Sequence, residues 1–133
     1  MERIAVFPGS FDPFTVGHEE IVRRALKLFD KIIIAVGINP GKREFLSTES
    51  RIKLIQKAFE DTDRVSVEPY SGLTVDFCQQ VNSHIIIRGL RTAADFEYER
   101  AIGQANRAMD GAIETVFILT STVHTFVSST IVR

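Results

Sequence analysis

The sequence predicts an α/β fold, a single domain built on a parallel five-stranded sheet with helices on both faces. Short runs of β-branched and apolar residues alternate along the chain with longer amphipathic stretches. Two of the apolar runs, KIIIAVGI and HIII, show no polar alternation, which is typical of strands covered on both faces. Segments rich in glycine, polar and basic residues come directly or shortly after predicted strands. Together these observations favour parallel strands joined by right-handed helical crossovers.

Five strands are expected, and each is a short apolar run bounded by turn residues. Pro8-Gly9 is expected to end the first strand, and Pro69 is expected to follow the third. The predicted strands are residues 4–7, 31–38, 65–67, 84–87 and 115–119.

Helices are expected between successive strands, in the order of a Rossmann-like sheet. Ser47 is expected to cap the second helix, with Glu49 near its positive end. The predicted helices are residues 17–29, 47–59, 74–81 and 93–109, and a last one that begins at Ser128. The apolar face of the first helix is expected to hold Ile21, Val22, Ala25, Leu28 and Phe29.

The composition is that of an ordinary globular protein. The 133 residues are enough for one domain, residues 1–133, with a core of its own. The 16 basic and 17 acidic residues nearly cancel, so no global field attracts nucleic acid or a membrane. Cys78 is the only cysteine, which excludes an internal disulfide and a cysteine zinc site and favours the reducing cytoplasm. No secretory leader or membrane span is predicted.

Polar and basic segments gather at one edge of the predicted sheet. GSFDPFTVGH, NPGKR, RGLR and HTFVSST follow the first, second, fourth and fifth strands. In open parallel sheets, ligands bind beyond the carboxyl ends of the strands, where the strand order reverses. We therefore expect these four segments to form one binding site.

A tight turn leads from the first strand into a helix that opens near His18. Gly9 lets the turn approach a ligand closely, and the start of a helix attracts anions through its free N–H groups and its dipole. A solvent-facing histidine after a turn is the alternative interpretation. The combination of the Ser10 hydroxyl, a turn and His18 within nine positions favours an anion site.

Two arginines leave the fourth strand together, in Arg88-Gly89-Leu90-Arg91. The planar fork of a guanidinium suits the oxygens of a phosphate. The alternative is a solvated loop whose arginines are neutralised by the acidic segment DFEYE. Further along, Ser128-Ser129-Thr130 offers hydroxyl and amide groups that can either cap a helix or cradle a phosphate.

These motifs resemble those of a known family. PGSFDPFTVGH matches the T/SGxFDPxxxGH signature of the nucleotidyltransferase superfamily, with Thr15 in place of the first histidine of HxGH. IRGLRTAADFEYE and VSST are similar to the RGLR-DFEYE pair and the ISSS/T motif of phosphopantetheine adenylyltransferases. The resemblance covers the chain from about Ile4 to Arg133 and implies a nucleotidyltransferase domain that lacks the C-terminal helical tail of the family.

The resemblance also implies roles for individual residues. His18, Lys42 and Arg91 are implied as catalytic, around the transferred phosphate and the departing pyrophosphate. The residues implied to bind the acceptor are Ser10, Lys42, Thr74 and Arg88, with Arg88 on its phosphate. The residues implied on the ATP side are Ser10, Phe11, His18, Gly89, Leu90, Arg91, Glu99, His124, Thr125, Phe126, Val127, Ser128, Ser129 and Thr130.

By the same resemblance, the chain would transfer the adenylyl group of ATP to 4′-phosphopantetheine, giving dephospho-CoA and pyrophosphate in the penultimate step of coenzyme A biosynthesis. The acceptor phosphate is already anionic, so in-line attack needs no general base and no covalent intermediate. Mg²⁺ would arrive with the triphosphate rather than in a protein cage. The family further implies binding of dephospho-CoA and CoA, and a homo-oligomer, usually a hexamer.

Three other functions stay open on the sequence. A nucleotidyltransferase for another acceptor, such as nicotinamide mononucleotide or a glycerol phosphate, would share the GSFDP turn but is expected to lack the RGLR-DFEYE pair. A binding module without turnover is disfavoured by the intact His18, Lys42, Arg88 and Arg91. A flavodoxin-like module would need an acidic phosphoacceptor cluster or flavin loops, and the sequence has neither.

Overall fold

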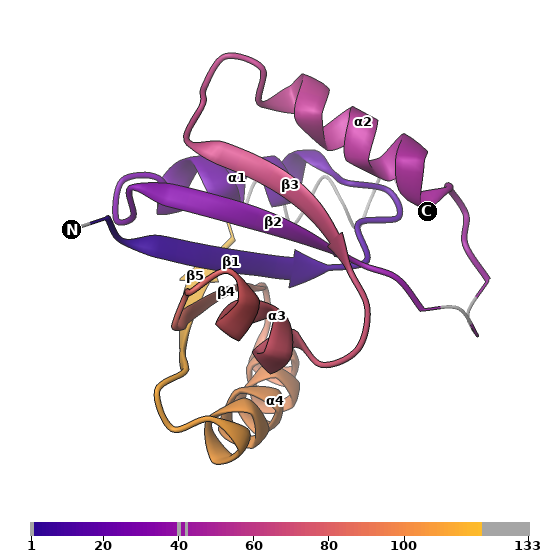
Figure 1. Ribbon diagram of the computed structural model, residues 1–133. Helices are drawn as coiled ribbons and strands as arrows, with labels where there is room; N and C mark the ends of the chain where they lie inside the picture. Colours follow the sequence, from indigo (N-terminus) through magenta and orange to yellow (C-terminus); the bar gives the residue numbers. More distant parts are fainter. Residues whose placement is uncertain (1, 40, 42, 121–133) are drawn as a thin grey trace.

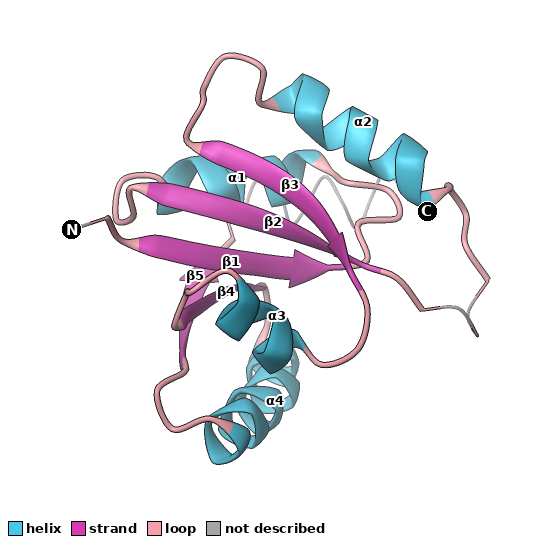
Figure 2. Ribbon diagram, viewed as in Figure 1, coloured by secondary structure: helices cyan, strands magenta, loops and turns pink. Residues whose placement is uncertain are grey.

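Five parallel strands form the sheet of the computed structural model, which describes residues 2–39, 41 and 43–120 (Figure 1). In sheet order they are β3 (Val65–Tyr70), β2 (Lys31–Gly37), β1 (Ile4–Gly9), β4 (Ile85–Leu90) and β5 (Glu114–Leu119). The helices between them are α1 (Val16–Ala25), α2 (Thr48–Ala58), α3 (Thr74–Gln80) and α4 (Ala93–Met109) (Figure 2). The predicted class and element order are confirmed for this part of the chain. The helix expected from Ser128 lies outside the described residues.

Helices cover both faces of the sheet, as expected (Figure 1). On one face, Val22 of α1 and Ile55 of α2 pack in a cluster with Phe7 of β1. On the other face, Val6 of β1 packs with Phe77 of α3. Neighbouring residues of a strand point to opposite faces, so β1 is buried on both sides. This burial explains why the central strands read as apolar runs without polar alternation.

The sheet reverses its strand order at β1, the central strand. β1 and β2 pair along their full length, whereas the ladder between β1 and β4 is short and sets Val6 opposite Ile86. Pro8 has no N–H with which to continue that ladder. Its carbonyl oxygen instead accepts a hydrogen bond from Arg88 Nη1 at 2.7 Å. The carboxyl ends of β1 and β4 are therefore joined by the side chain of Arg88.

Three strands run further than predicted. β1 continues through Gly9 and β4 through Leu90. The first residues of the PGSFDPFTVGH and RGLR motifs therefore lie inside strands. β3 includes Pro69. This strand is at the edge of the sheet, where proline is tolerated because only one neighbour requires backbone hydrogen bonds.

The first helix is shorter than predicted, and the second agrees at its start. After Ala25 the chain tightens, and Lys27 and Leu28 donate to carbonyls only three residues earlier. The tighter turn leaves Leu28 52% exposed, so its predicted place on the buried face was wrong. Ser47 is the N-cap of α2, as expected. Among the residues described, no helix combines the length and apolar character needed to span a membrane.

Candidate functional site

Two adjoining cavities lie at the carboxyl edge of the sheet. One, of about 530 Å³, extends toward α3 and α4 and is called here the α3-side cavity. The other, of about 600 Å³, extends toward α1 and is called the α1-side cavity. Both are lined by Pro8, Gly9, Ser10, Arg88 and Glu99. The ends of β1 and β4 therefore form a wall shared by two compartments, at the predicted reversal point.

The side chain of Arg88 is held in this shared wall at three points. Its Nε and Nη2 atoms each lie 2.8 Å from one carboxylate oxygen of Glu99, and Nη1 donates to Pro8. The Glu99 side chain is only 10% exposed and that of Arg88 is 29% exposed. A guanidinium has five N–H donors, and contacts with described residues engage three of them. The remaining N–H groups can donate to an anion without breaking the ion pair.

The second arginine of the motif also has a carboxylate partner. Arg91 Nε lies 3.5 Å from Asp95 Oδ2, and the side chain of Arg91 is 57% exposed. Both arginines are thus paired with acids of the DFEYE segment, which the alternative interpretation anticipated. The two pairs differ in kind, because Arg88 is fixed and half-buried whereas Arg91 projects from the wall of the α1-side cavity.

His18 is placed by the way α1 begins. Thr15 is the N-cap, and its hydroxyl oxygen accepts from the His18 amide at 3.3 Å. In return the Thr15 amide donates to His18 Nδ1 at 2.9 Å, which completes a capping box. Because Nδ1 accepts, the ring proton of the neutral imidazole is assigned to Nε2. His18 lies in the first turn of α1, as predicted, and it lines the α1-side cavity.

The surroundings of His18 keep its ring neutral. Burial lowers the pKa of His18 from 6.5 to about 4, and the nearby charges of Arg88 and Arg91 lower it in the same direction. Phe11 packs edge-on against the imidazole, with ring centroids 5.0 Å apart. At neutral pH the neutral imidazole therefore offers one N–H hydrogen-bond donor and does not act as a general acid.

The other predicted residues near this cavity have unequal positions. Ser10, Phe11, Gly89 and Arg91 line the α1-side cavity. The Phe11 ring itself is buried against Gly9, where a Cβ atom would come within 2.8 Å of Phe11 Cζ. Leu90 lines neither cavity, and its carbonyl oxygen accepts from the Thr120 amide.

The α3-side cavity contains residues that the sequence analysis missed. Thr74 lines it, as expected, and its hydroxyl lies 2.9 Å from the hydroxyl of Tyr70, which was not predicted. Three further lining residues of α4 were missed, and a signal for them existed. Together with Glu99 they recur at helical spacing on one face: Ile102, Gly103 and Asn106.

Two predicted groups lie outside the described residues. They are Lys42 and the run from His124 to Thr130. Among the residues that are described, no group of three or more His, Cys, Asp or Glu side chains could hold a metal ion. Cys78, expected to be a core residue, is fully buried in the cluster beneath α3.

The chain matches a family model described as cytidylyltransferase-like over residues 6–133. It is 50% identical over 131 residues to the phosphopantetheine adenylyltransferase of Flavobacterium johnsoniae, covering 98% of this chain and 86% of that protein. It is also 50% identical over 133 residues to the phosphopantetheine adenylyltransferase of Leptospira biflexa, covering 100% and 83%. The protein of that name from Bacteroides fragilis is 47% identical over 131 residues, covering 98% and 87%.

Solved structures share the fold at lower identity. A lipopolysaccharide core biosynthesis protein from Thermoplasma volcanium has a TM-score of 0.62 at 20% identity, with 91% of this chain and 98% of that chain covered. A bifunctional NMN adenylyltransferase/ADP ribose pyrophosphatase from Francisella tularensis, complexed with AMP and a manganese ion, has a TM-score of 0.66 at 21% identity. That match covers 92% of this chain and 38% of the other. These likenesses confirm the sheet architecture.

Proposed function

The chain belongs to the phosphopantetheine adenylyltransferase family, and we propose that its two cavities hold the two substrates of that reaction on either side of Arg88. The protein transfers the adenylyl group of ATP to 4′-phosphopantetheine, releasing pyrophosphate and forming dephospho-CoA. ATP binds in the α1-side cavity and phosphopantetheine in the α3-side cavity. The observation that carries this assignment is the wall that the cavities share, in which two N–H groups of Arg88 have no partner among the described residues.

The acceptor phosphate is the nucleophile. It binds to the free N–H groups of Arg88, which a bidentate pair with Glu99 holds in a fixed direction. Its oxygen then attacks the α-phosphorus of ATP from the α3-side cavity, and pyrophosphate departs on the opposite side. Because the attacking oxygen is already anionic, the reaction needs alignment and charge stabilisation rather than a base.

His18 supplies part of the charge stabilisation. Its ring is neutral and carries the proton on Nε2, since Nδ1 accepts from Thr15. We place Nε2–H on an α-phosphate oxygen, where negative charge grows in the transition state. A neutral donor suits this role because its hydrogen bond to the phosphate oxygen strengthens as negative charge develops, and the ring keeps its proton. Lys42 is proposed to contact the same phosphate.

The departing pyrophosphate is stabilised at the outer end of the α1-side cavity. Arg91 and Gly89 line this cavity, and the missing side chain of Gly89 leaves room for Ile21 of α1 to pack against its backbone. We propose that the run 124–130 completes the phosphate contacts. Mg²⁺ would enter with the triphosphate, whose oxygens are hard ligands of the kind it prefers, and when bound it would supply charge neutralisation for the leaving group. The manganese ion of the Francisella tularensis protein is consistent with use of a divalent ion.

The pantetheine arm occupies the α3-side cavity. Thr74 and Tyr70 provide hydroxyl groups there, and Ile102 of α4 provides an apolar surface.

Exposed apolar side chains on α4, including Tyr98 at 68% and Phe96 at 40% exposed, support a homo-oligomer. By likeness to the family we propose a hexamer in the cytoplasm, with CoA and dephospho-CoA as further ligands.

The experiment that tests this function is pyrophosphate release from ATP with a panel of phosphorylated acceptors. We expect turnover with 4′-phosphopantetheine and none with nicotinamide mononucleotide or glycerol phosphate. Turnover with the mononucleotide alone would reassign the acceptor cavity. Binding of ATP and phosphopantetheine without pyrophosphate release would instead support a binding module.

A further inference from the structure

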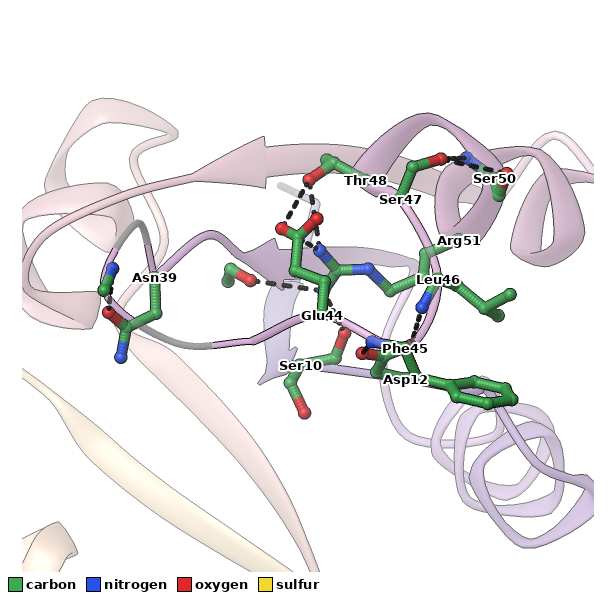
Figure 3. A network of polar contacts seen from close by, with 12 residues as sticks. Ser10, Asp12, Asn39, Glu44, Phe45, Leu46, Ser47, Thr48, Ser50 and Arg51 are labelled. Atoms are coloured by element: carbon green, nitrogen blue, oxygen red, sulfur yellow. Dashed lines mark hydrogen bonds and ion pairs between the residues drawn. The ribbon is translucent and has the colours of Figure 1, made fainter.

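A buried arginine outside both cavities ties two loops of the site together (Figure 3). Arg51 lies in the first half of α2, and its side chain is 3% exposed. Its guanidinium reaches back to the carboxyl edge of the sheet, between the turn that follows β1 and the loop that follows β2. It has no place in the motifs identified from the sequence.

The guanidinium of Arg51 makes contacts on both loops. Nη1 donates to the carbonyl oxygen of Ser10 at 2.7 Å and approaches that of Gly37 at 3.4 Å. Nη2 donates to Glu44 Oε1 at 2.9 Å and to the Thr48 hydroxyl at 3.0 Å. The planar fork of arginine can satisfy such diverging acceptors, whereas the single ammonium of lysine cannot reach them all.

A second tie runs beside the first. The carboxylate of Asp12 accepts from the amides of Phe45 at 2.6 Å and of Leu46 at 2.7 Å. Figure 3 shows Asp12 and Arg51 on either side of this stretch of loop. The turn after β1 and residues 44–46 are therefore locked together by one cation and one anion. Arg51 lines neither substrate cavity, whereas Asp12 also lines the α1-side cavity.

Stability alone does not explain a charge in this position. Removing a guanidinium from water is unfavourable, and a well-packed apolar side chain of similar volume often stabilises a fold as well or better. Compensation is also incomplete, because Arg51 Nε is buried and has no hydrogen-bond partner among the described residues. The guanidinium instead orients specific backbone carbonyl groups, those of Ser10 and Gly37.

The orientation of the Ser10 carbonyl bears directly on the site. A trans peptide is planar, with its C=O and N–H pointing in opposite directions. Because Arg51 holds the Ser10 carbonyl, the N–H of the Ser10–Phe11 peptide points away from Arg51. Ser10 lines both cavities and Phe11 lines the α1-side cavity. Arg51 thus determines which way a peptide in the shared wall faces.

We propose that Arg51 is a positioning residue for adenylyl transfer. It holds the Ser10–Phe11 peptide and residues 44–46 in fixed positions relative to the two substrates. This inference rests on the proposed function and deepens it. It concerns alignment rather than contact, so its effect falls on kcat more than on the KM for either substrate.

The test compares Arg51→Met and Arg51→Lys with Arg64→Met in the full chain. Arg64 is a matched control, because its guanidinium also joins backbone carbonyls, those of Leu26, Phe29 and Asp30, but at the amino ends of the strands. Pyrophosphate release with ATP and 4′-phosphopantetheine is measured per folded enzyme, alongside thermal unfolding. We expect kcat to fall about 10- to 100-fold in both Arg51 variants, with smaller changes in KM.

Arg51→Lys keeps a buried positive charge, so it covers the case in which Arg51→Met fails to fold. Arg64→Met is expected to lower the unfolding temperature while keeping kcat. Equal losses of kcat in the Arg51 and Arg64 variants, or a loss confined to KM, would overturn the positioning role.

Amide hydrogen exchange gives a second readout that needs no turnover. In Arg51→Lys we expect the Phe45 and Leu46 amides to exchange about tenfold faster or more, since their segment loses one of its two ties. In Arg64→Met these amides should keep their protection. Unchanged exchange in Arg51→Lys would contradict the tie itself. Absence of pyrophosphate release from the unaltered protein would count against the proposed function, and the exchange experiment would still decide whether Arg51 holds residues 44–46 in place.

Discussion

Arg88 and Glu99 face each other across the end of β4 as a fork-to-fork ion pair, with both contacts at 2.8 Å. They are eleven positions apart in the sequence, and they meet because α4 folds back along the sheet it follows. The pair holds the Arg88 guanidinium in a fixed direction in a wall that two cavities share. Its geometry leads to a prediction about stability and to another about binding.

Removal of Arg88 should destabilise the fold more than removal of Arg91. Arg88→Ala leaves the Glu99 carboxylate, only 10% exposed, without its partner, so we expect a loss of about 2–4 kcal/mol in the free energy of unfolding. Arg91 is 57% exposed, and Arg91→Ala should change that free energy by less than about 1 kcal/mol. Urea unfolding of both variants measures the difference. Equal losses would mean that the Arg88 pair contributes no more than an exposed one.

The same two arginines should each contribute to the binding of a different substrate. We expect Arg88→Ala to weaken binding of phosphopantetheine and Arg91→Ala to weaken binding of ATP. Loss of a charge-assisted contact worth roughly 1.5–3 kcal/mol corresponds to about 10- to 150-fold in affinity. Isothermal titration of each variant with each ligand, well below its unfolding temperature, distinguishes the effects. If both variants lost affinity for the same ligand only, the shared-wall assignment would be wrong.

His18→Ala should bind ATP almost normally and turn over slowly. The Nε2–H donor acts on charge that develops in the transition state, so kcat and kcat/KM should fall together. Deletion of one such donor lowers kcat by roughly 10²–10³-fold. Steady-state kinetics and ATP titration check this, with circular dichroism to confirm folding. Near-normal kcat in a folded variant is the result that removes His18 from the mechanism.

The lowered pKa of His18 should also be visible in stability. The unfolded chain binds a proton at this residue near pH 6.5, whereas the folded protein does so only near pH 4. Stability therefore falls as the pH drops from about 6.5 to 4, and this contribution is constant above about pH 7. Relative to His18→Gln, the folded protein should lose on the order of 2–3 kcal/mol across that window. Urea unfolding at pH 7.5 and pH 4.5 provides the comparison, and parallel losses in both proteins would contradict the pKa assignment.

The sequence by itself determined the order of the elements and the edge at which the site forms. Apolar runs such as those of β2 and β4 identify buried strands, because a strand covered on both faces has no room for polar alternation. Parallel strands then bring the segments after β1 and β4 to one edge, whatever the details of packing. Helix starts were also local matters, and Ser47 caps α2 as its residue type suggests.

Only the tertiary structure decided which side chains meet. Arg51 reaches Ser10 across 41 positions of sequence and Arg88 reaches Pro8 across 80, and no local pattern marks either contact. The lowered pKa of His18 likewise follows from burial and from Arg88 and Arg91, which the fold brings near its ring. Burial of Arg51 and Glu99 depends on how α2 and α4 pack against the sheet edge. Propensity and periodicity act over a few residues, whereas these pairings are set by strand order and helix docking, which bring together residues far apart in the chain.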